Sequence, residues 1–248
     1  MLHGRTFWRA VIGVAAAVLG SFPALAGSLT VFPVRVQLSA DEPVQTLTVR
    51  NSGGEPSRVQ LRVYAWSQAA GEEVLAETRE VLANPPLFEI APGDEQLARL
   101  GLRASAGDVE RSYRVILEEV PIDELARPGE VRALLRISIP IFVPPAAARV
   151  QLDWSARPSD GALMLGLANG GNTHVQISRL TITRADGSPL GAEDMSVYLL
   201  PGARTERSFA VSLPVRSGER LRIEVLTDSD PLSAEIVAGG SSGEAGRP

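Results

Sequence analysis

The sequence predicts an all-β protein made of β-sandwich domains, because nearly every regular segment alternates apolar and polar residues. A period of two is typical of strands with one buried face. Turn signals rich in glycine, proline and asparagine separate the runs, for example Asn51-Ser52-Gly53-Gly54, Ala91-Pro92-Gly93-Asp94 and Asp186-Gly187. No amphipathic helix extends beyond a turn or two, so short strands at this spacing favour sandwiches.

Residues 1–26 have the pattern of a cleaved secretory signal. Arg5 and Arg9 precede an apolar run from Ala10 to Leu19, and the segment ends in the small-residue pattern Ala24-Leu25-Ala26. The apolar run is about ten residues long, well short of the roughly 20 that span a bilayer, and no later segment is long enough. An uncleaved anchor is the alternative. We expect cleavage after Ala26, export, and no membrane insertion.

The composition fits an exported, folded protein without thiol chemistry. Lysine is absent, so all 24 basic residues are arginine; they face 29 acidic residues, for a formal net charge of −5. Acidic charge spread along the chain argues against nucleic acid as a partner and gives no support for anionic membranes. Because there is no cysteine, disulfides, thiolate metal sites and thiol nucleophiles are excluded, and stability must come from core packing.

The predicted strands follow one another along the chain in the same pattern. In each, aliphatic or aromatic residues at alternate positions share one face, and mostly charged or amide side chains occupy the other. The clearest are Ser57–Trp66, Tyr113–Leu117 and Leu221–Val225. Residues 169–172, Asn-Gly-Gly-Asn, are expected to form a tight hairpin, since glycine and asparagine tolerate positive φ.

A longer stripe from Val131 to Val143 is the most informative segment. All of its odd-numbered positions are aliphatic: Val131, Ala133, Leu135, Ile137, Ile139, Ile141 and Val143. Pro140 lies within it, and because proline cannot donate to a ladder, we expect this strand at a sheet edge. A long apolar edge promotes aggregation unless a partner pairs with it, so its simplest use is to lend a strand to another protein. The plain core face of a sandwich is the alternative.

A domain boundary is expected at residues 144–148, Pro-Pro-Ala-Ala-Ala. Two prolines after a long strand stop its pairing, and the short alanine run makes a compact hinge. The first domain would span residues 27–145 and the second 146–238, each of a size that suits one sandwich. Residues 239–248 have nothing to bury, and we expect a disordered tail there.

Several segments, taken in order, resemble one protein family. They are FPVRVQL at 32–38, NPPLFEIAPGDEQLARL at 84–100, SYRVILEEVP at 112–121, RISIPIFVPP at 136–145 and LANGGNTHVQISRL at 167–180. With them the chain resembles periplasmic pilus-assembly chaperones of the chaperone–usher pathway, closest to the archaic, spore-coat-U-associated branch. The resemblance implies two immunoglobulin-like β-sandwich domains in a boomerang arrangement. It also implies residence in the periplasm, pilin subunits as partners, and delivery of those subunits to an outer-membrane usher.

In this family the last strand of the first domain is donated to a pilus subunit that lacks its own final strand. By register, the resemblance implies that the donor strand is 131–143 and that the inserted residues are Val131, Ala133, Leu135 and Ile137. Capping would stabilise the folded subunit by mass action. When free, the chaperone could hide the same edge in a self-capping dimer, and the sequence leaves this open.

The resemblance also implies a site for the subunit's C-terminal carboxylate, formed by one arginine and one lysine. The arginine position falls on Arg35 and the lysine position on Pro140. Because the chain has no lysine, another cation must take its place. We expect Arg114, on the strand flanking the donor, rather than Arg136 on the donor's other face. A guanidinium suits this role because its planar fork can bind a carboxylate with two N–H groups.

Ordinary structural roles are the alternatives for these residues. Arg35 could be a solvated side chain on an edge strand, and Arg114 could form an internal ion pair with Glu118 or Glu119. His174 is the one histidine beyond the expected signal. We expect it to be structural, since a single imidazole cannot make a metal site.

No motif in the chain indicates catalysis. It has no HExxH, no GxSxG and no phosphate-binding glycine loop before a helix, and its carboxylates are scattered. We therefore expect no enzyme, no cofactor and no metal. The competing functions are a secreted structural or adhesive module and a carbohydrate-binding sandwich. A surplus strand argues against the first. The second usually needs exposed aromatics, whereas Trp66 and Trp154 lie in apolar-looking strands.

Overall fold

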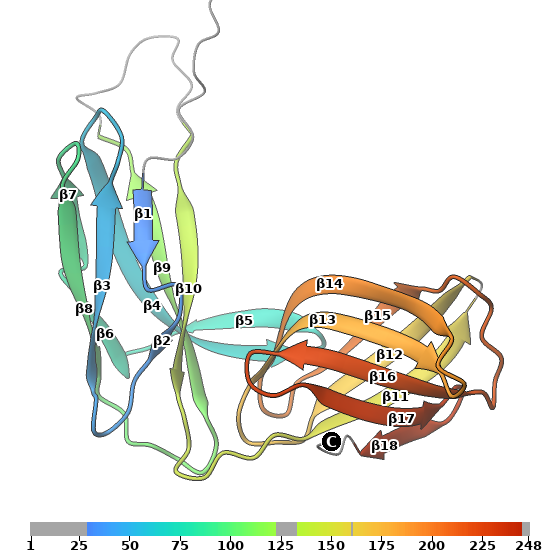
Figure 1. Cartoon of the computed structure of the whole chain (residues 1–248). Helices are drawn as coiled ribbons and strands as arrows, with labels where there is room; N and C mark the ends of the chain where they lie inside the picture. Colours follow the sequence, from blue (N-terminus) through green and yellow to red (C-terminus); the bar gives the residue numbers. More distant parts are fainter. Residues whose placement is uncertain (1–28, 123–132, 160, 245–248) are drawn as a thin grey trace, which may run out of the picture.

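The computed structural model of the protein describes residues 29–122, 133–159 and 161–244, and every regular element in these ranges is a β-strand. The strands form four sheets that make two sandwiches, set at an angle to one another like the arms of a boomerang (Figure 1). This confirms the predicted all-β fold. The same ranges contain no helix that is long and apolar enough to cross a membrane. The expected signal at residues 1–26 lies outside the described residues.

The first sandwich packs a four-stranded sheet against a larger one. In spatial order the smaller sheet contains β1 (Leu29–Phe32), β3 (Val44–Asn51), β8 (Glu95–Leu102) and β6 (Val81–Asn84). The larger sheet contains β2 (Val36–Gln37), β10 (Arg136–Val143), β9 (Arg111–Val120), β4 (Ser57–Ala69) and β5 (Glu72–Glu77), and β7 (Leu87–Ile90) pairs with the other end of β4. The pairs are antiparallel except for β2 and β10, which run parallel.

The second sandwich has two antiparallel four-stranded sheets. One contains, in spatial order, β15 (Arg204–Ala210), β12 (Ala162–Asn169), β11 (Leu152–Ser159) and β18 (Ser241–Glu244). The other contains β14 (Pro189–Leu199), β13 (Val175–Arg184), β16 (Arg220–Thr227) and β17 (Leu232–Val237). The boundary expected at residues 144–148 falls in the segment between β10 and β11.

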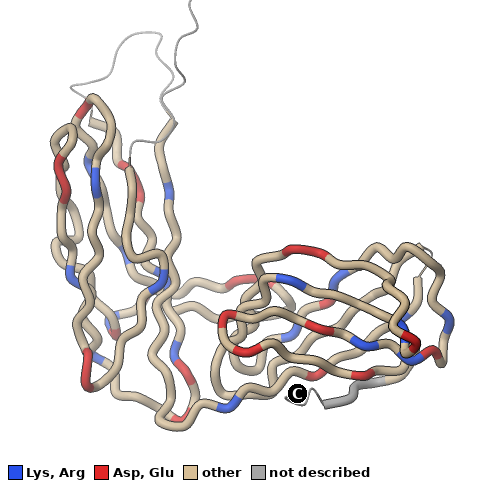
Figure 2. Tube along the Cα trace, viewed as in Figure 1, with Lys and Arg blue, Asp and Glu red and all other residues tan. Residues whose placement is uncertain are grey.

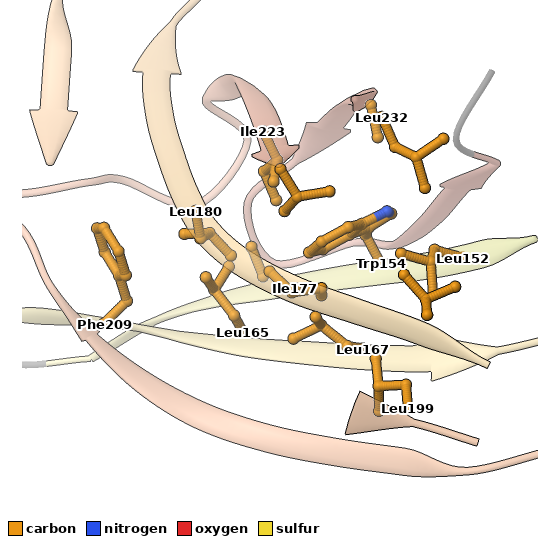
Figure 3. Packing of buried hydrophobic residues seen from close by; sticks show 14 of the residues in the cluster. Leu152, Trp154, Leu165, Leu167, Ile177, Leu180, Leu199, Phe209, Ile223 and Leu232 are labelled. Atoms are coloured by element: carbon orange, nitrogen blue, oxygen red, sulfur yellow. The ribbon is translucent and has the colours of Figure 1, made fainter. Parts of the chain in front are cut away.

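Each sandwich has its own apolar core, built by the alternation read from the sequence. In β16 the alternate residues Leu221, Ile223 and Val225 are buried and their neighbours are exposed. Trp154 lies deep in the second core, surrounded by aliphatic side chains from both sheets (Figure 3). Two aromatic residues of the first sandwich, Trp66 and Phe142, belong to this same second cluster. The two sandwiches therefore share an apolar contact.

Asn51, at the end of β3, forms a buried corner in the first sandwich where the chain crosses to the opposite sheet. Its side-chain amide donates to the carbonyl oxygens of Glu55 at 2.8 Å and Ile90 at 3.0 Å. Its side-chain oxygen accepts the N–H of Gly53 at 2.9 Å. One side chain thus satisfies three backbone groups where the ladder ends, which is why a buried polar residue is tolerated here.

Asn169, at the end of β12, repeats this corner in the second sandwich. Its amide donates to the carbonyls of Thr173 and Leu199, both at 2.8 Å, and its oxygen accepts the N–H of Gly171 at 2.9 Å. The predicted hairpin at residues 169–172 is wrong, because β12 and β13 lie in different sheets. The side chain of Asn169 closes a crossing between sheets, which the turn-forming composition alone cannot distinguish from a hairpin.

The prediction of a disordered tail is wrong for Ser241–Glu244. This segment forms β18, which pairs antiparallel with the edge of β11 at Asp153 and Ser155. Gly239, at φ 85°, makes the turn into it, and its N–H donates to the carbonyl of Ala156. Backbone hydrogen bonds at a sheet edge need no apolar side chains, so composition gave no sign of the strand. Residues 245–248 lie outside the described ranges.

Candidate functional site

Strand β10 is paired along one side and half open along the other. On one side it faces β9 from Arg136 to Val143. On the other, β2 pairs only with Ile141 and Phe142. Within the described ranges, no strand covers that side of residues 136–139. The expectation of an edge strand is therefore right for the first half of β10 and wrong for its end, where the short β2 closes the edge.

Pro140 fits the strand because its missing N–H lies on the open side. The carbonyl of Leu135 accepts from Glu119 of β9, whereas the carbonyl of Phe142 accepts from Leu38, just after β2. In a strand the N–H and C=O of one residue point to the same side and alternate along the chain. Even-numbered residues of β10 therefore direct their backbone groups away from β9. Pro140 removes a donor from the open edge and none from the ladder with β9.

The residues expected to enter a subunit lie at the beginning of this open half. Leu135 and Ile137 are partly buried against the first core, and Ala133 is exposed. The predicted strand began at Val131, but β10 begins at Arg136, and Val131 lies outside the described residues. One reason is local: β9 ends at Val120, so the ladder has no partner for residues before about position 134. The stripe continues into the first core through the buried Ile139, Ile141 and Val143.

Arg35, Pro140, Arg114 and Tyr64 form one row across the larger sheet of the first sandwich. Pro140 is directly opposite Arg114, which is in turn opposite Tyr64 on β4. On the other side Val36 pairs with Ile141, so the preceding residue, Arg35, lies beside Pro140. Register partners share a face of a sheet. The position expected for a lysine therefore lies between two arginines, and we call this face, turned away from the first core, the junction face.

Arg114 lies against aromatic rings at the junction of the two sandwiches. Its guanidinium carbon is 3.7 Å from the centre of the Trp66 ring and 5.6 Å from that of Tyr198, a cation–π arrangement. Its Nη2 donates to Glu73 of β5 at 2.7 Å. Glu73 is thus its ion-pair partner, in place of the Glu118 or Glu119 considered from the sequence. Its buried Nε has no hydrogen-bond partner among the described residues.

Arg35 reaches from the first sandwich to the second. Its Nη1 donates to Asp228, in the turn after β16, and its Nη2 donates to the side-chain oxygen of Gln176 on β13 at 3.3 Å. The arginine side chain keeps 41% of its surface exposed, whereas that of Asp228 keeps 14%. Basic and acidic residues are interleaved through both sandwiches (Figure 2). The ion pair of Arg35 with Asp228 is therefore not part of an extended basic patch.

Tyr198, near the end of β14, lies beside Arg114, whose guanidinium carbon is 5.6 Å from the centre of its ring. Burial raises the pKa of its hydroxyl, while the positive charges of Arg35 and Arg114 act in the opposite direction. The Tyr198 and Trp66 rings are also in a T-shaped contact, with ring centres 5.5 Å apart. The structure brings the two predicted anchor residues to a common location on the junction face.

His174, in the second sandwich, contacts residues of the first sandwich near Arg35 and Arg114. Its ring stacks on Phe142 of β10, with centres 3.6 Å apart. Its Nδ1 lies 2.8 and 2.9 Å from the two carboxylate oxygens of Glu110, which precedes β9 and has only 2% of its side chain exposed. Glu110 also accepts the hydroxyl of Thr173 at 2.9 Å. The expectation of a structural histidine is confirmed by these contacts.

Arg136 lies on the same face of β10 but away from this location. It is four residues, about 13 Å along the strand, from Pro140. Its Nε lies 3.2 Å from Glu118 and its side chain is 64% exposed. Asp228 and Glu73, the carboxylates that pair with Arg35 and Arg114, were not identified from the sequence, because their positions give no sign of that contact. In the described part of the chain, no three histidine or acidic side chains are grouped as a metal site.

Two comparisons with known proteins bear on this arrangement. Residues 28–149 match the family described as pili and flagellar-assembly chaperone, PapD N-terminal domain. The structure of the CsuC–CsuE chaperone–tip adhesion subunit pre-assembly complex, from archaic chaperone–usher Csu pili of Acinetobacter baumannii, is similar at 25% identity. That match covers 85% of this chain and 98% of that chain, with a TM-score of 0.64. No curated protein matches the sequence.

Two further solved structures share the fold at lower identity. The structure of the Salmonella enterica SafA pilin in complex with the SafB chaperone matches at 20% identity over 85% of this chain and 96% of that chain, with a TM-score of 0.55. The Pseudomonas aeruginosa CupB2 chaperone matches at 18% identity over 85% of this chain and 100% of that chain, with a TM-score of 0.53.

Proposed function

This chain belongs to the pili and flagellar-assembly chaperones, and from that premise we propose that it caps pilus subunits by donating the open half of β10. Its general role, a chaperone in pilus-subunit assembly, follows from the family. One observation carries the finer proposal. Within the described ranges, no strand pairs with residues 136–139 on the side away from β9, and the side chains on one face of this part of the chain, Leu135 and Ile137, are apolar. A subunit that lacks one strand needs backbone partners and apolar side chains together, and this edge offers both.

The inserted side chains would be Val131, Ala133, Leu135 and Ile137, at alternate positions before and within the open half. Because β9 ends at Val120, Val131 and Ala133 lie beyond the ladder with β9, and a subunit groove would supply a strand partner for them. Backbone pairing gives adhesion that does not depend on subunit sequence, and the alternate side chains give selectivity. The interaction stabilises the folded subunit because it binds only that state.

The subunit's C-terminal carboxylate would be held by Arg35 and Arg114. Two observations support this: the two arginines flank Pro140 in one register row, and the Nε of Arg114 is buried without a partner among the described residues. Two guanidinium groups would replace the arginine–lysine pair expected from the resemblance. Each can supply several N–H donors in a fixed plane.

The setting of this activity follows from the family and from residues 1–26. We propose that the protein is exported to the periplasm, works without catalysis or a cofactor, and passes its subunits to an outer-membrane usher. When free, the open edge could pair with the same edge of a second copy. Such pairing would be released by the subunit, since both would use the same backbone groups of β10.

Leu135→Asp tests the donated strand. It would place an unpaired carboxylate in an apolar groove at a cost of several kcal/mol, of about the size expected for burying an isolated charge. Capture of the co-expressed pilin should be lost, as measured by the yield of the 1:1 complex. Leu134→Asp is the matched control, because Leu134 is exposed and the neighbouring position faces the opposite way. Thermal unfolding of both free variants separates loss of binding from loss of folding. Undiminished capture by Leu135→Asp would exclude strand donation in this register.

Arginine variants test the carboxylate anchor. Arg35→Ala or Arg114→Ala should weaken pilin binding by about 2–5 kcal/mol, the range for removing one partner of a desolvated charge pair. The double variant should lose less than the sum, because both side chains act on one group. Arg136→Ala, whose side chain pairs with Glu118, should change little. Full affinity in Arg35→Ala would contradict the anchor, and additive losses would remove Arg114 from it.

A further inference from the structure

In the free protein Arg35 already holds a carboxylate. Its Nη1 donates to Asp228, and the Asp228 side chain comes from the second sandwich, 193 positions along the chain. The contact is charge-assisted and lies where the proposed function places the carboxylate of a subunit. Arg114 shows a similar arrangement with Glu73, but the Glu73 side chain is 52% exposed on the outermost strand, whereas the Asp228 side chain is 14% exposed.

Asp228 is fixed from several sides. Its Oδ1 accepts the backbone N–H of Gln176 at 3.2 Å, and its Oδ2 lies 3.5 Å from Nε2 of His174. Burial acts to raise the pKa of this carboxyl, yet the hydrogen bonds from Arg35 and Gln176 and the nearby His174 leave it below its usual value. Asp228 is therefore an anion at neutral pH, and it is held in place independently of any ligand.

A second carboxylate cannot use the same N–H group of Arg35 without competition. The N–H group that donates to Asp228 is occupied in the free state, and a neighbouring anion would also repel an incoming one. The guanidinium itself remains accessible, since 41% of the Arg35 side chain is exposed. An arriving carboxylate can thus reach Arg35 but must displace Asp228 or share the cation with it.

We propose that Asp228 is an internal counter-ligand of Arg35, which occupies the anchor in the free chaperone and is displaced by the subunit's C-terminal carboxylate. This rests on the proposed function. Two consequences follow. The apparent affinity for subunits is lower than the intrinsic affinity, by the fraction of molecules in which Arg35 is free. Binding also removes one contact between the two sandwiches, so subunit capture is coupled to the junction between them.

Asp228→Asn tests the proposal because asparagine can still accept the Gln176 N–H but carries no charge. The probe is a synthetic peptide with the C-terminal strand of the pilin that co-purifies with the chaperone, made as a free acid and as a C-terminal amide. Calorimetric titration should show that Asp228→Asn binds the free acid about two- to fivefold more tightly than the wild type, the range for a partly exposed ion pair. The amide should bind both proteins equally.

The free variant should also melt at a lower temperature, because it has lost a contact between the sandwiches. This opposite movement of stability and affinity distinguishes a displaced counter-ligand from a residue that merely supports the fold, which would lower both. Asp194→Asn is the matched control. It removes the same charge from the same sandwich, where Asp194 pairs with Arg179 at the surface, and it should not change either affinity.

The peptide pair separates this inference from the proposed function. If the wild type prefers the free acid but Asp228→Asn gains nothing or loses affinity, the counter-ligand is excluded and the anchor stands. If the wild type does not distinguish acid from amide, the anchor fails and the counter-ligand fails with it. Should Asp228→Asn not fold, Asp228→Ser is measured in the same way, since its hydroxyl can still accept the Gln176 N–H.

Discussion

The two sandwiches of this protein treat their comparable parts differently. In the second, the edge of β11 is paired with β18, a segment whose sequence has no apolar pattern. In the first, one side of β10 stays open over residues 136–139, within the described ranges. The edge of β11 is therefore closed by a strand without an apolar pattern, whereas the apolar edge strand β10 stays unpaired over residues 136–139. An edge kept open at the risk of aggregation is best explained by a partner strand.

The two asparagine corners also differ between the sandwiches. Asn51 and Asn169 make equivalent hydrogen bonds, but the residues three positions later differ. A Cβ added at Gly54 would meet no atom within 4 Å. Asn172 donates to the carbonyls of Asp108, in the first sandwich, and Ala147, in the connecting segment, both at 2.9 Å. One residue thus converts a self-contained corner into a contact between the sandwiches.

Replacing the asparagine that both corners share should give the largest loss of stability. Asn51→Ala and Asn169→Ala each leave two carbonyls and one N–H without their partner, at about 1–3 kcal/mol for each buried unsatisfied group. We expect each variant to lose at least about 3 kcal/mol in the free energy of unfolding, measured by urea denaturation. Similar losses would support equivalence of the two corners. A loss confined to one of them would show that the likeness is only geometric.

Glycine substitutions should separate the corners next. A Cβ at Gly171 would overlap the carbonyl oxygen of Arg149 and lie 2.9 Å from the N of Gln151, both of them backbone atoms. Gly171→Ala should therefore destabilise by about 1–3 kcal/mol, as other overpacked sites do. Gly54→Ala, one position further along in the first corner and with no atom within 4 Å of its added Cβ, is the control and should stay within about 0.5 kcal/mol of the wild type. Equal effects would mean that the second corner is not packed against the connecting segment as described.

Asn172→Gly would give the second corner the residue that the first has at this position. It removes three side-chain hydrogen bonds at a partly exposed site, two donated by the amide and one accepted from the N–H of Arg149 at 2.6 Å, so we expect a loss of about 1–2 kcal/mol in stability. The angle between the sandwiches should also become more variable, which small-angle scattering can detect as a broader distance distribution. An unchanged scattering profile would contradict a role for Asn172 in orienting the domains.

The strands of both sandwiches could be predicted from the sequence because alternation is a local signal. β16 and the buried half of β10 have the faces that their patterns indicate. The strand β18 could not, since a Ser-Gly segment pairs through backbone groups that no side-chain pattern marks. The corner at Asn169 was mistaken for a hairpin because turn composition does not say which sheet the chain enters next.

For the candidate site, the sequence indicated the arginines but not their surroundings. Arg35 was indicated by the resemblance to the family and Arg114 by its place in an otherwise apolar strand, and the register row around Pro140 brings them together. The contact between Arg35 and Asp228 joins residues 193 positions apart, and it depends on how the two sandwiches pack. Such a contact follows from tertiary structure, and nothing in the local sequence around Asp228 marks it.

The most direct test of the central claim is amide hydrogen exchange along β10, with and without a bound pilin. In the free chaperone the N–H groups of Ile137 and Ile139 point toward β9 and should exchange slowly, whereas those of Arg136 and Ser138 point to the open side and should exchange fast. On pilin binding, Arg136 and Ser138 should slow to the rates of their neighbours. Unchanged fast exchange at Ser138 in a complex that is otherwise intact would contradict strand donation by β10.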